Sequence, residues 1–301
     1  MNGDFHGSYL PEDVTFLLKP ISMPLLSIAE KERRIQSGLC HYSEMLSPEQ
    51  PPSPRYLALF QEALARGGSR FARDVSLLAG VIHRDIAEPI TLVSLARAGT
   101  PIGVLLNREL GRRYKRDVRH YSISIIRDRG IDENALLHII NVQKRPQEGI
   151  VFVDGWTGKG VIGRELDKAI ADCNLRHGTA LRSRLYVVAD LCGAAHTAAT
   201  TEDYLIPSSV LNATVSGLVS RSVPNSETIG PRDIHGCLYN REIEAQALSR
   251  LFFDSVFAMM EVATLDPEYG AALRQAPLYH RMFSDNFTRR PMDPRPVTAG
   301  S

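Results

Sequence analysis

The sequence has 301 residues, of which 44% are hydrophobic and 23% are charged, with a formal net charge of +1. This composition supports a sizeable hydrophobic core and excludes an intrinsically disordered chain. The balance of 35 basic and 34 acidic residues gives no electrostatic reason to expect nucleic acid or an anionic membrane as a partner. No stretch reaches the length of a bilayer-spanning helix, and the polar N-terminus lacks the pattern of a signal peptide, so we expect a cytoplasmic protein.

The first part of the chain is irregular and then helical. Residues 1–54 show no clear period apart from a short charged helix at 28–38, and they end in the turn-rich run SPEQPPSP. We therefore expect an irregular N-terminal extension over 1–54. Apolar residues at helical spacing predict helix over 55–87, and the pair Gly67-Gly68 is expected to divide it into two helices.

From residue 89 onward, short apolar runs alternate with helical patterns. Four runs predict buried strands, at 89–96, 118–126, 149–154 and 184–191. The segments between them predict helices, at 102–114, 132–143 and 160–174. Strands that are apolar on both faces belong to parallel sheets covered by helices on each side, so the predicted fold class is α/β with a parallel sheet.

The domain prediction follows from these patterns. After the extension at 1–54, we expect an α/β core over 55–223 and a C-terminal helical segment over 224–285. The strongest helical pattern of that segment lies at 240–263. The proline-containing tail at 286–301 is expected to be disordered.

Ligands of parallel α/β sheets bind beyond the carboxyl ends of the strands. After the third predicted strand, the run DGWTGKG at 154–160 leads through glycines into a helix. Backbone amides and the dipole at a helix start form an anion site, to which Thr157 can add a hydroxyl and Lys159 a charge. The spacing differs from a Walker A loop. The alternative is a tight strand-to-helix turn without a ligand, but arginines after two other strands favour an anionic ligand.

The motifs resemble a known family. VFVDGWTGKG resembles the phosphoribosyl-pyrophosphate motif of type I phosphoribosyltransferases. Four longer strings resemble a bacterial family described as phosphoribosyltransferase-like and also as cysteine protease StiP: SLARAGTPIGVLLNREL, HYSISIIRDRGID, EDYLIPSSVLNATVSGLVSR and IQSGLCHYSEMLSPE. The resemblance extends over about residues 8–260, and it implies a phosphoribosyltransferase-like core.

The resemblance to phosphoribosyltransferases implies an enzyme that transfers ribose 5-phosphate from phosphoribosyl pyrophosphate to a base-like or small-molecule acceptor and releases pyrophosphate. It also implies Mg²⁺ as a cofactor and a homodimer. Asp154 matches the acid that holds the ribose hydroxyls, or a water on the metal. The usual motif has two adjacent acids, whereas Gly155 occupies the second position here. Ribose binding is therefore expected to differ from that of the family.

The same resemblance implies roles for the residues that follow the strands. The 5-phosphate would be bound by Gly155, Trp156, Thr157, Gly158, Lys159 and Gly160. The loop that meets pyrophosphate would be Ala96, Arg97, Ala98 and Gly99. Arg127 and Arg129 fall in a loop that closes over the site, so Arg97, Arg127 and Arg129 join Asp154 as candidate catalytic residues.

Two alternatives remain open. The first is a cysteine peptidase, which needs a thiolate beside a histidine. Of the four widely spaced cysteines, Cys40, Cys173, Cys192 and Cys237, Cys192 is the best placed because it follows a strand. Their spacing, without a CxxC pair, argues against a zinc site or a disulfide framework. The second alternative is a regulator that binds a nucleotide or sugar phosphate without catalysis, which the missing second acid would fit.

Overall fold

The structure, a computed structural model, describes residues 5–38, 41–224 and 228–263. Its centre is a sheet with the strand order β1-β4-β3-β6-β7-β8, in which all neighbours on this path are parallel. The strands are β1 (Thr15–Phe16), β3 (Ile90–Ala96), β4 (Val118–Ile126), β6 (Ile150–Thr157), β7 (Leu185–Asp190) and β8 (Thr197–Thr200). A short strand, β5 (Gly130–Ile131), pairs antiparallel with β4. Outside this sheet, β2 (Lys19–Pro20) pairs with β9 (Gly236–Cys237).

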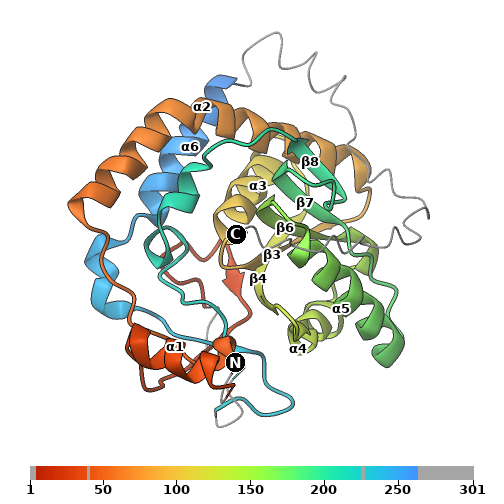
Figure 1. Cartoon of the computed structure of the whole chain (residues 1–301). Helices are drawn as coiled ribbons and strands as arrows, with labels where there is room; N and C mark the ends of the chain where they lie inside the picture. The colour runs from red at the N-terminus through yellow and green to blue at the C-terminus, as the bar shows by residue number, and fades with distance from the viewer. Residues whose placement is uncertain (1–4, 39–40, 225–227, 264–301) are drawn as a thin grey trace, which may run out of the picture.

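Helices cover both faces of the sheet (Figure 1). One face packs against α2 (Pro54–Asp85), α3 (Thr100–Arg112) and α6 (Ser249–Ala263), and the other against α4 (Glu133–Leu137) and α5 (Val161–His177). Successive strand residues point to opposite faces, so Leu92 joins the first hydrophobic cluster and Val93 the second. The prediction of an α/β fold with a mostly parallel sheet between helices is confirmed.

The remaining helical segments are short, apart from α1 (Ile28–Gln36) near the N-terminus. A π-helical turn, His138–Val142, continues α4. The 3₁₀ turns are Tyr42–Glu44, Gln147–Gly149, Pro207–Val210, Ala213–Val215 and Arg241–Gln246. Within the described residues, no helix combines the length and the apolar character that a bilayer crossing requires.

The Gly67-Gly68 pair does not divide a helix, as the sequence predicted, because α2 runs through it without a break. A Cβ on Gly68 would lie 2.7 Å from Sδ of Met259 on α6. The missing side chain therefore lets α6 approach α2 closely, and tertiary packing outweighs the weak helix propensity of glycine. The other predicted elements of the core lie close to the observed ones.

The N-terminal segment contributes to the sheet and its packing. Strand β1 pairs with the edge of β4, and Arg108 of α3 lies 2.6 Å from the carboxylate of Asp13. The predicted tail at 286–301, and the end of the predicted C-terminal segment from 264 to 285, lie outside the described residues.

His120 of β4 is a buried structural histidine. Its Nδ1 donates to the carbonyl oxygen of Asp13 at 2.9 Å, and its Nε2 accepts from the Ser94 hydroxyl at 2.8 Å. Burial lowers the pKa of His120 to about 4, so the imidazole is neutral at neutral pH. The ring packs directly against α3, where a Cβ on Gly103 would lie 2.2 Å from Nε2.

We predict that Gly103→Ala lowers the free energy of unfolding by about 1–3 kcal/mol, because the new methyl group must displace a ring that two hydrogen bonds hold. Gly111→Ala on the same helix is the matched control. Its Cβ would meet Val118 at an ordinary 3.5 Å, so it should be neutral or stabilise by about 0.5–1 kcal/mol. Denaturant unfolding of both variants measures the difference, and equal stability of the two would contradict the prediction.

Candidate functional site

An exposed thiol lies where β6 and β7 end side by side. Thr157, the last residue of β6, is paired with Asp190, the last residue of β7. Cys192 follows two residues later and is exposed. Its Sγ lies 3.1 Å from Oγ1 of Thr157 and 3.6 Å from a carboxylate oxygen of Asp190. Both strands end at the carboxyl edge of the sheet, where α/β proteins bind their ligands.

The carboxylate of Asp190 fixes the backbone around this thiol. It accepts hydrogen bonds from the backbone N–H groups of Cys192 at 3.1 Å, Ala194 at 3.2 Å and Ala195 at 2.8 Å. Burial by itself favours the protonated acid, but these N–H groups outweigh burial and hold the pKa of Asp190 below its usual value. The ionised carboxylate therefore sets the position of Cys192 relative to β6.

The start of α5 faces the same thiol. Gly160, the N-cap of α5, has φ +66°. A Cβ on Gly160 would lie 3.0 Å from a guanidinium nitrogen of Arg164, 3.4 Å from Sγ of Cys192 and 2.7 Å from Cβ of Ala194. Glycine is therefore required at position 160, because φ is positive there and because a side chain would collide with Ala194. The thiol of Cys192 and a guanidinium nitrogen of Arg164 thus both lie close to Gly160, at the N-terminus of α5.

The run 154–160 is only partly a loop. Gly155, Trp156 and Thr157 belong to β6, and Trp156 and Thr157 are paired with β7, so the turn itself consists of Gly158, Lys159 and Gly160. Trp156 is 44% exposed. The binding of phosphate by these residues is not tested and stays a prediction.

Asp154 is half-buried in β6. Its carboxylate accepts a hydrogen bond from the N–H of Gly155 at 2.8 Å. Burial raises the pKa of Asp154 to about 7, although that hydrogen bond acts in the opposite direction. Its proposed roles towards ribose and Mg²⁺ remain predictions from the sequence.

The predicted pyrophosphate loop packs against β6. Ala96 ends β3, and Gly99 is the N-cap of α3. A Cβ on Gly99 would lie 2.4 Å from the carbonyl oxygen of Val153. The segment from Ala96 through Ala98 to Gly99 is therefore closely fitted to its neighbouring strand.

Carboxylates of the N-terminal segment pair with two of the predicted anion-binding arginines. Arg97 lies 2.5 Å from Glu49, and both side chains are 19% exposed. Arg129 pairs with Glu44. Both carboxylates come from residues 41–49, which Arg221 also holds through the carbonyl oxygens of Tyr42 and Met45. Arg127 is exposed. These pairs are not predictable from the sequence, because nothing local to either arginine indicates its distant partner.

The other cysteines have different surroundings. Cys237 is fully buried, and burial raises the pKa of its thiol to about 12. Its near neighbour His235 instead contacts Ser124 through Nδ1 at 2.7 Å, so adjacency in the sequence does not make a thiol–imidazole pair here. Cys40 lies outside the described residues.

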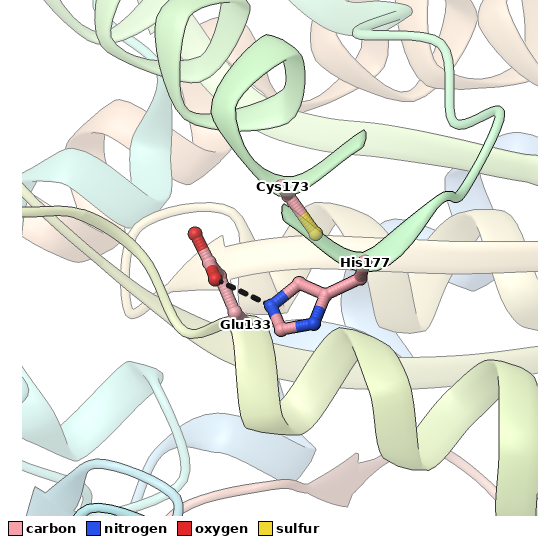
Figure 2. A group of neighbouring side chains, drawn as sticks. All are labelled: Glu133, Cys173 and His177. Atoms are coloured by element: carbon pink, nitrogen blue, oxygen red, sulfur yellow. Dashed lines mark hydrogen bonds and ion pairs between the residues drawn. The ribbon is translucent and has the colours of Figure 1, made fainter. Parts of the chain in front are cut away.

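Cys173 lies beside an imidazole and a carboxylate (Figure 2). His177 Nε2 is 2.8 Å from an oxygen of Glu133, and all three side chains converge between α4 and α5. Cys173 is fully buried, and burial raises the pKa of its thiol. A substrate carbonyl would have to enter the core to reach it, which argues against a nucleophile at this position.

Comparison with known proteins decides the family. A family model described as "tellurite-like stress resistance cysteine protease StiP" matches residues 7–257. The chain belongs to the StiP family. It is 44% identical over 263 residues to a protein of Acinetobacter baylyi (strain ATCC 33305 / BD413 / ADP1) named "Cysteine protease StiP". The alignment covers 84% of this chain and 67% of that relative.

These findings overturn the phosphoribosyl-transfer hypothesis. The family and the relative are named as cysteine proteases, so the predictions of a glycosyltransferase, of phosphoribosyl pyrophosphate and of an acceptor as partners were wrong. The physical reason is that a strand followed by a glycine turn and a helix is common to parallel sheets of many functions. Mg²⁺ and the homodimer are not tested and stay predictions.

The raised pKa of Asp154 predicts a specific dependence of stability on pH. The folded carboxyl keeps its proton up to about pH 7, whereas the unfolded one loses it near its usual pKa of 3.8. The folded state therefore binds more protons between these values, and stability falls as the pH rises from about 4 to 7.

We predict that Asp154→Asn removes this decline, on the order of a few kcal/mol across the window. Unfolding midpoints measured from pH 4 to 8 for wild type and variant test it. Asp190→Asn should have the opposite effect on the pH dependence of stability. The pKa of Asp190 is lower in the folded state than in the unfolded state, so its ionised carboxylate stabilises the fold at neutral pH, and this contribution is lost on acidification. Parallel wild-type and D154N curves would show that Asp154 is not the group concerned.

Proposed function

We propose that this chain is a cysteine peptidase whose nucleophile is Cys192. The single observation that carries the proposal is the position of this exposed thiol next to Gly160, the N-cap of α5. Among the described cysteines, Cys173 and Cys237 are buried and Cys192 alone is exposed. The name of the family and of the relative supports the reaction class.

The reaction follows from the chemistry of a thiolate. Its sulfur attacks the carbonyl carbon of a peptide bond, the C–N bond breaks, and the amine leaves with a proton. Water then hydrolyses the acyl thioester and regenerates the thiol. The backbone amides of the first turn of α5, close to Cys192, are suited to the oxyanion of the intermediate.

A cavity at the carboxyl ends of β6 and β7 fits a substrate side chain. It has a volume of about 440 Å³ and is lined by Trp156, Ala189, Leu191, Asp203, Tyr204, Leu205, Ile206 and Ser209. Its lining residues Trp156 and Leu191 directly precede Thr157 and Cys192 in the sequence, although neither Thr157 nor Cys192 lines the cavity. Tyr204 is held by a 2.8 Å hydrogen bond to Asp74. The mainly apolar lining of the cavity favours a peptide with a bulky apolar residue next to the cleaved bond.

The thiol proton needs an acceptor. Cys192 itself contacts a hydroxyl and a carboxylate, those of Thr157 and Asp190, rather than an imidazole. Two histidines lie towards the same edge of the sheet: His41, which begins the segment paired with Arg97 and Arg129, and His235, which contacts Ser124 near the end of β4. Burial lowers the pKa of His235, which keeps its imidazole neutral and able to accept a proton. We propose that one of these two histidines is the base.

Two finer predictions from the sequence accompany this proposal. The relation of the sheet to the phosphoribosyltransferase core stays a prediction, and so does a cytoplasmic location. Neither is needed for peptide hydrolysis at Cys192.

We predict that Cys192→Ala lowers the hydrolysis of an unfolded protein substrate by about 10³-fold or more, because the nucleophile is lost. Cys173→Ala is the matched control and should retain activity, since that thiol is buried away from substrate. His41→Ala and His235→Ala identify the base by which of them shares the loss. Full activity in C192A, with loss in Cys40→Ala instead, would overturn the assignment of Cys192 while leaving the reaction class standing.

A further inference from the structure

A second cluster of chemically active side chains lies at the other end of α5. Cys173 and His177 are four residues apart, which brings them to one face of the helix. Glu133, the first residue of α4, completes the cluster from across the helix interface (Figure 2). A sulfur, a ring nitrogen and a carboxylate oxygen all lie within 4.8 Å of one another.

These three ligand types are those of zinc proteins. Zinc binds thiolate sulfur at about 2.3 Å and imidazole nitrogen or carboxylate oxygen at about 2.0–2.2 Å, so tetrahedral ligand atoms stand about 3.3–3.8 Å apart. The cluster needs to contract by about 1 Å at its widest, which rotation of side chains can supply. Thiolate and imidazole together favour zinc over magnesium or calcium, which prefer oxygen ligands.

The position suits a cation. His177 is the last residue of α5, and the carboxyl end of a helix attracts positive charge. Arg176 contacts both oxygens of Glu133, Oε1 through a terminal guanidinium nitrogen and Oε2 through Nε at 3.2 Å, and His177 contacts Oε2 at 2.8 Å. A metal between His177 and Oε2 therefore replaces the contact from Arg176 Nε, while the pair of Arg176 with Oε1 can remain.

We propose that Glu133, Cys173 and His177 bind one zinc ion, with a water molecule as the fourth ligand. As the zinc–sulfur bond forms, the thiol proton leaves to solvent. Cys173 and Glu133 lie on the protected side, and the exposed His177 gives the ion its entry path. The site joins α4 to α5 and lies about 25 Å along α5 from the end that faces Cys192. It is thus independent of the proposed peptidase site.

Cobalt(II) is the probe, because a cobalt–thiolate bond gives an intense near-ultraviolet absorption band. The full-length chain is titrated with Co²⁺, and zinc is then added in competition. We expect one equivalent of cobalt to give the thiolate band and one equivalent of zinc to remove it. Zinc should also raise the unfolding midpoint of the wild-type chain.

Variants assign the ligands. Cys173→Ala should lose the band, and His177→Ala and Glu133→Gln should each weaken binding at least about 10-fold. Cys192→Ala, which removes the exposed thiol, should keep the band unchanged. Arg176→Gln should also keep the thiolate band, or strengthen cobalt binding by removing a competing cation. This variant tests the site while leaving all three ligands in place.

The results that overturn the proposal are equally specific. A wild-type chain that shows no thiolate band at stoichiometric cobalt binds no metal through Cys173. A band that persists in Cys173→Ala belongs to another thiol. A zinc-dependent rise of the unfolding midpoint that remains in a folded Cys173→Ala variant would also exclude this site.

Discussion

The carboxylate of Asp190 is the constraint on which the candidate site depends. It terminates β7, and its three backbone hydrogen bonds turn the chain so that Cys192 meets Thr157 of β6. The parallel pairing of β6 with β7 brings this turn to the start of α5, because α5 is the crossover helix that follows β6. Without an ionised Asp190, the thiol would lose its fixed distance from the helix N-terminus.

The N-terminal segment determines the charge of the same edge of the sheet. Glu44 and Glu49 pair with Arg129 and Arg97, so the chain supplies its own anions to guanidinium groups that would otherwise attract a polyphosphate. The half-buried Arg97–Glu49 pair is costly to separate, because removing one partner leaves a charge in a partly desolvated place. The cavity at the ends of β6 and β7 is lined mainly by apolar side chains.

Helix α5 connects the two clusters of reactive groups. Its N-cap, Gly160, lies next to Cys192, and Cys173 and His177 near its other end converge with Glu133. The helix dipole gives these ends opposite character, since the first turn favours a thiolate and the last favours a cation. Cys192, in the turn after β7, and Cys173, on α5 itself, therefore have different surroundings because they lie near opposite ends of this helix.

The sequence by itself determined the elements whose cause is local. Continuous apolar runs fixed β3, β4, β6 and β7 and hence the α/β class, and the place of Cys192 after a strand marked it as the best positioned thiol. Tertiary structure decided the rest. Two-residue β1 is a strand only because β4 lies beside it, and Gly67-Gly68 stays helical because Met259 packs there. The ion pair of Arg97 spans 48 residues, and Glu133 meets Cys173 only across a helix interface. Such contacts depend on distances in space, which the order of residues along the chain does not encode locally.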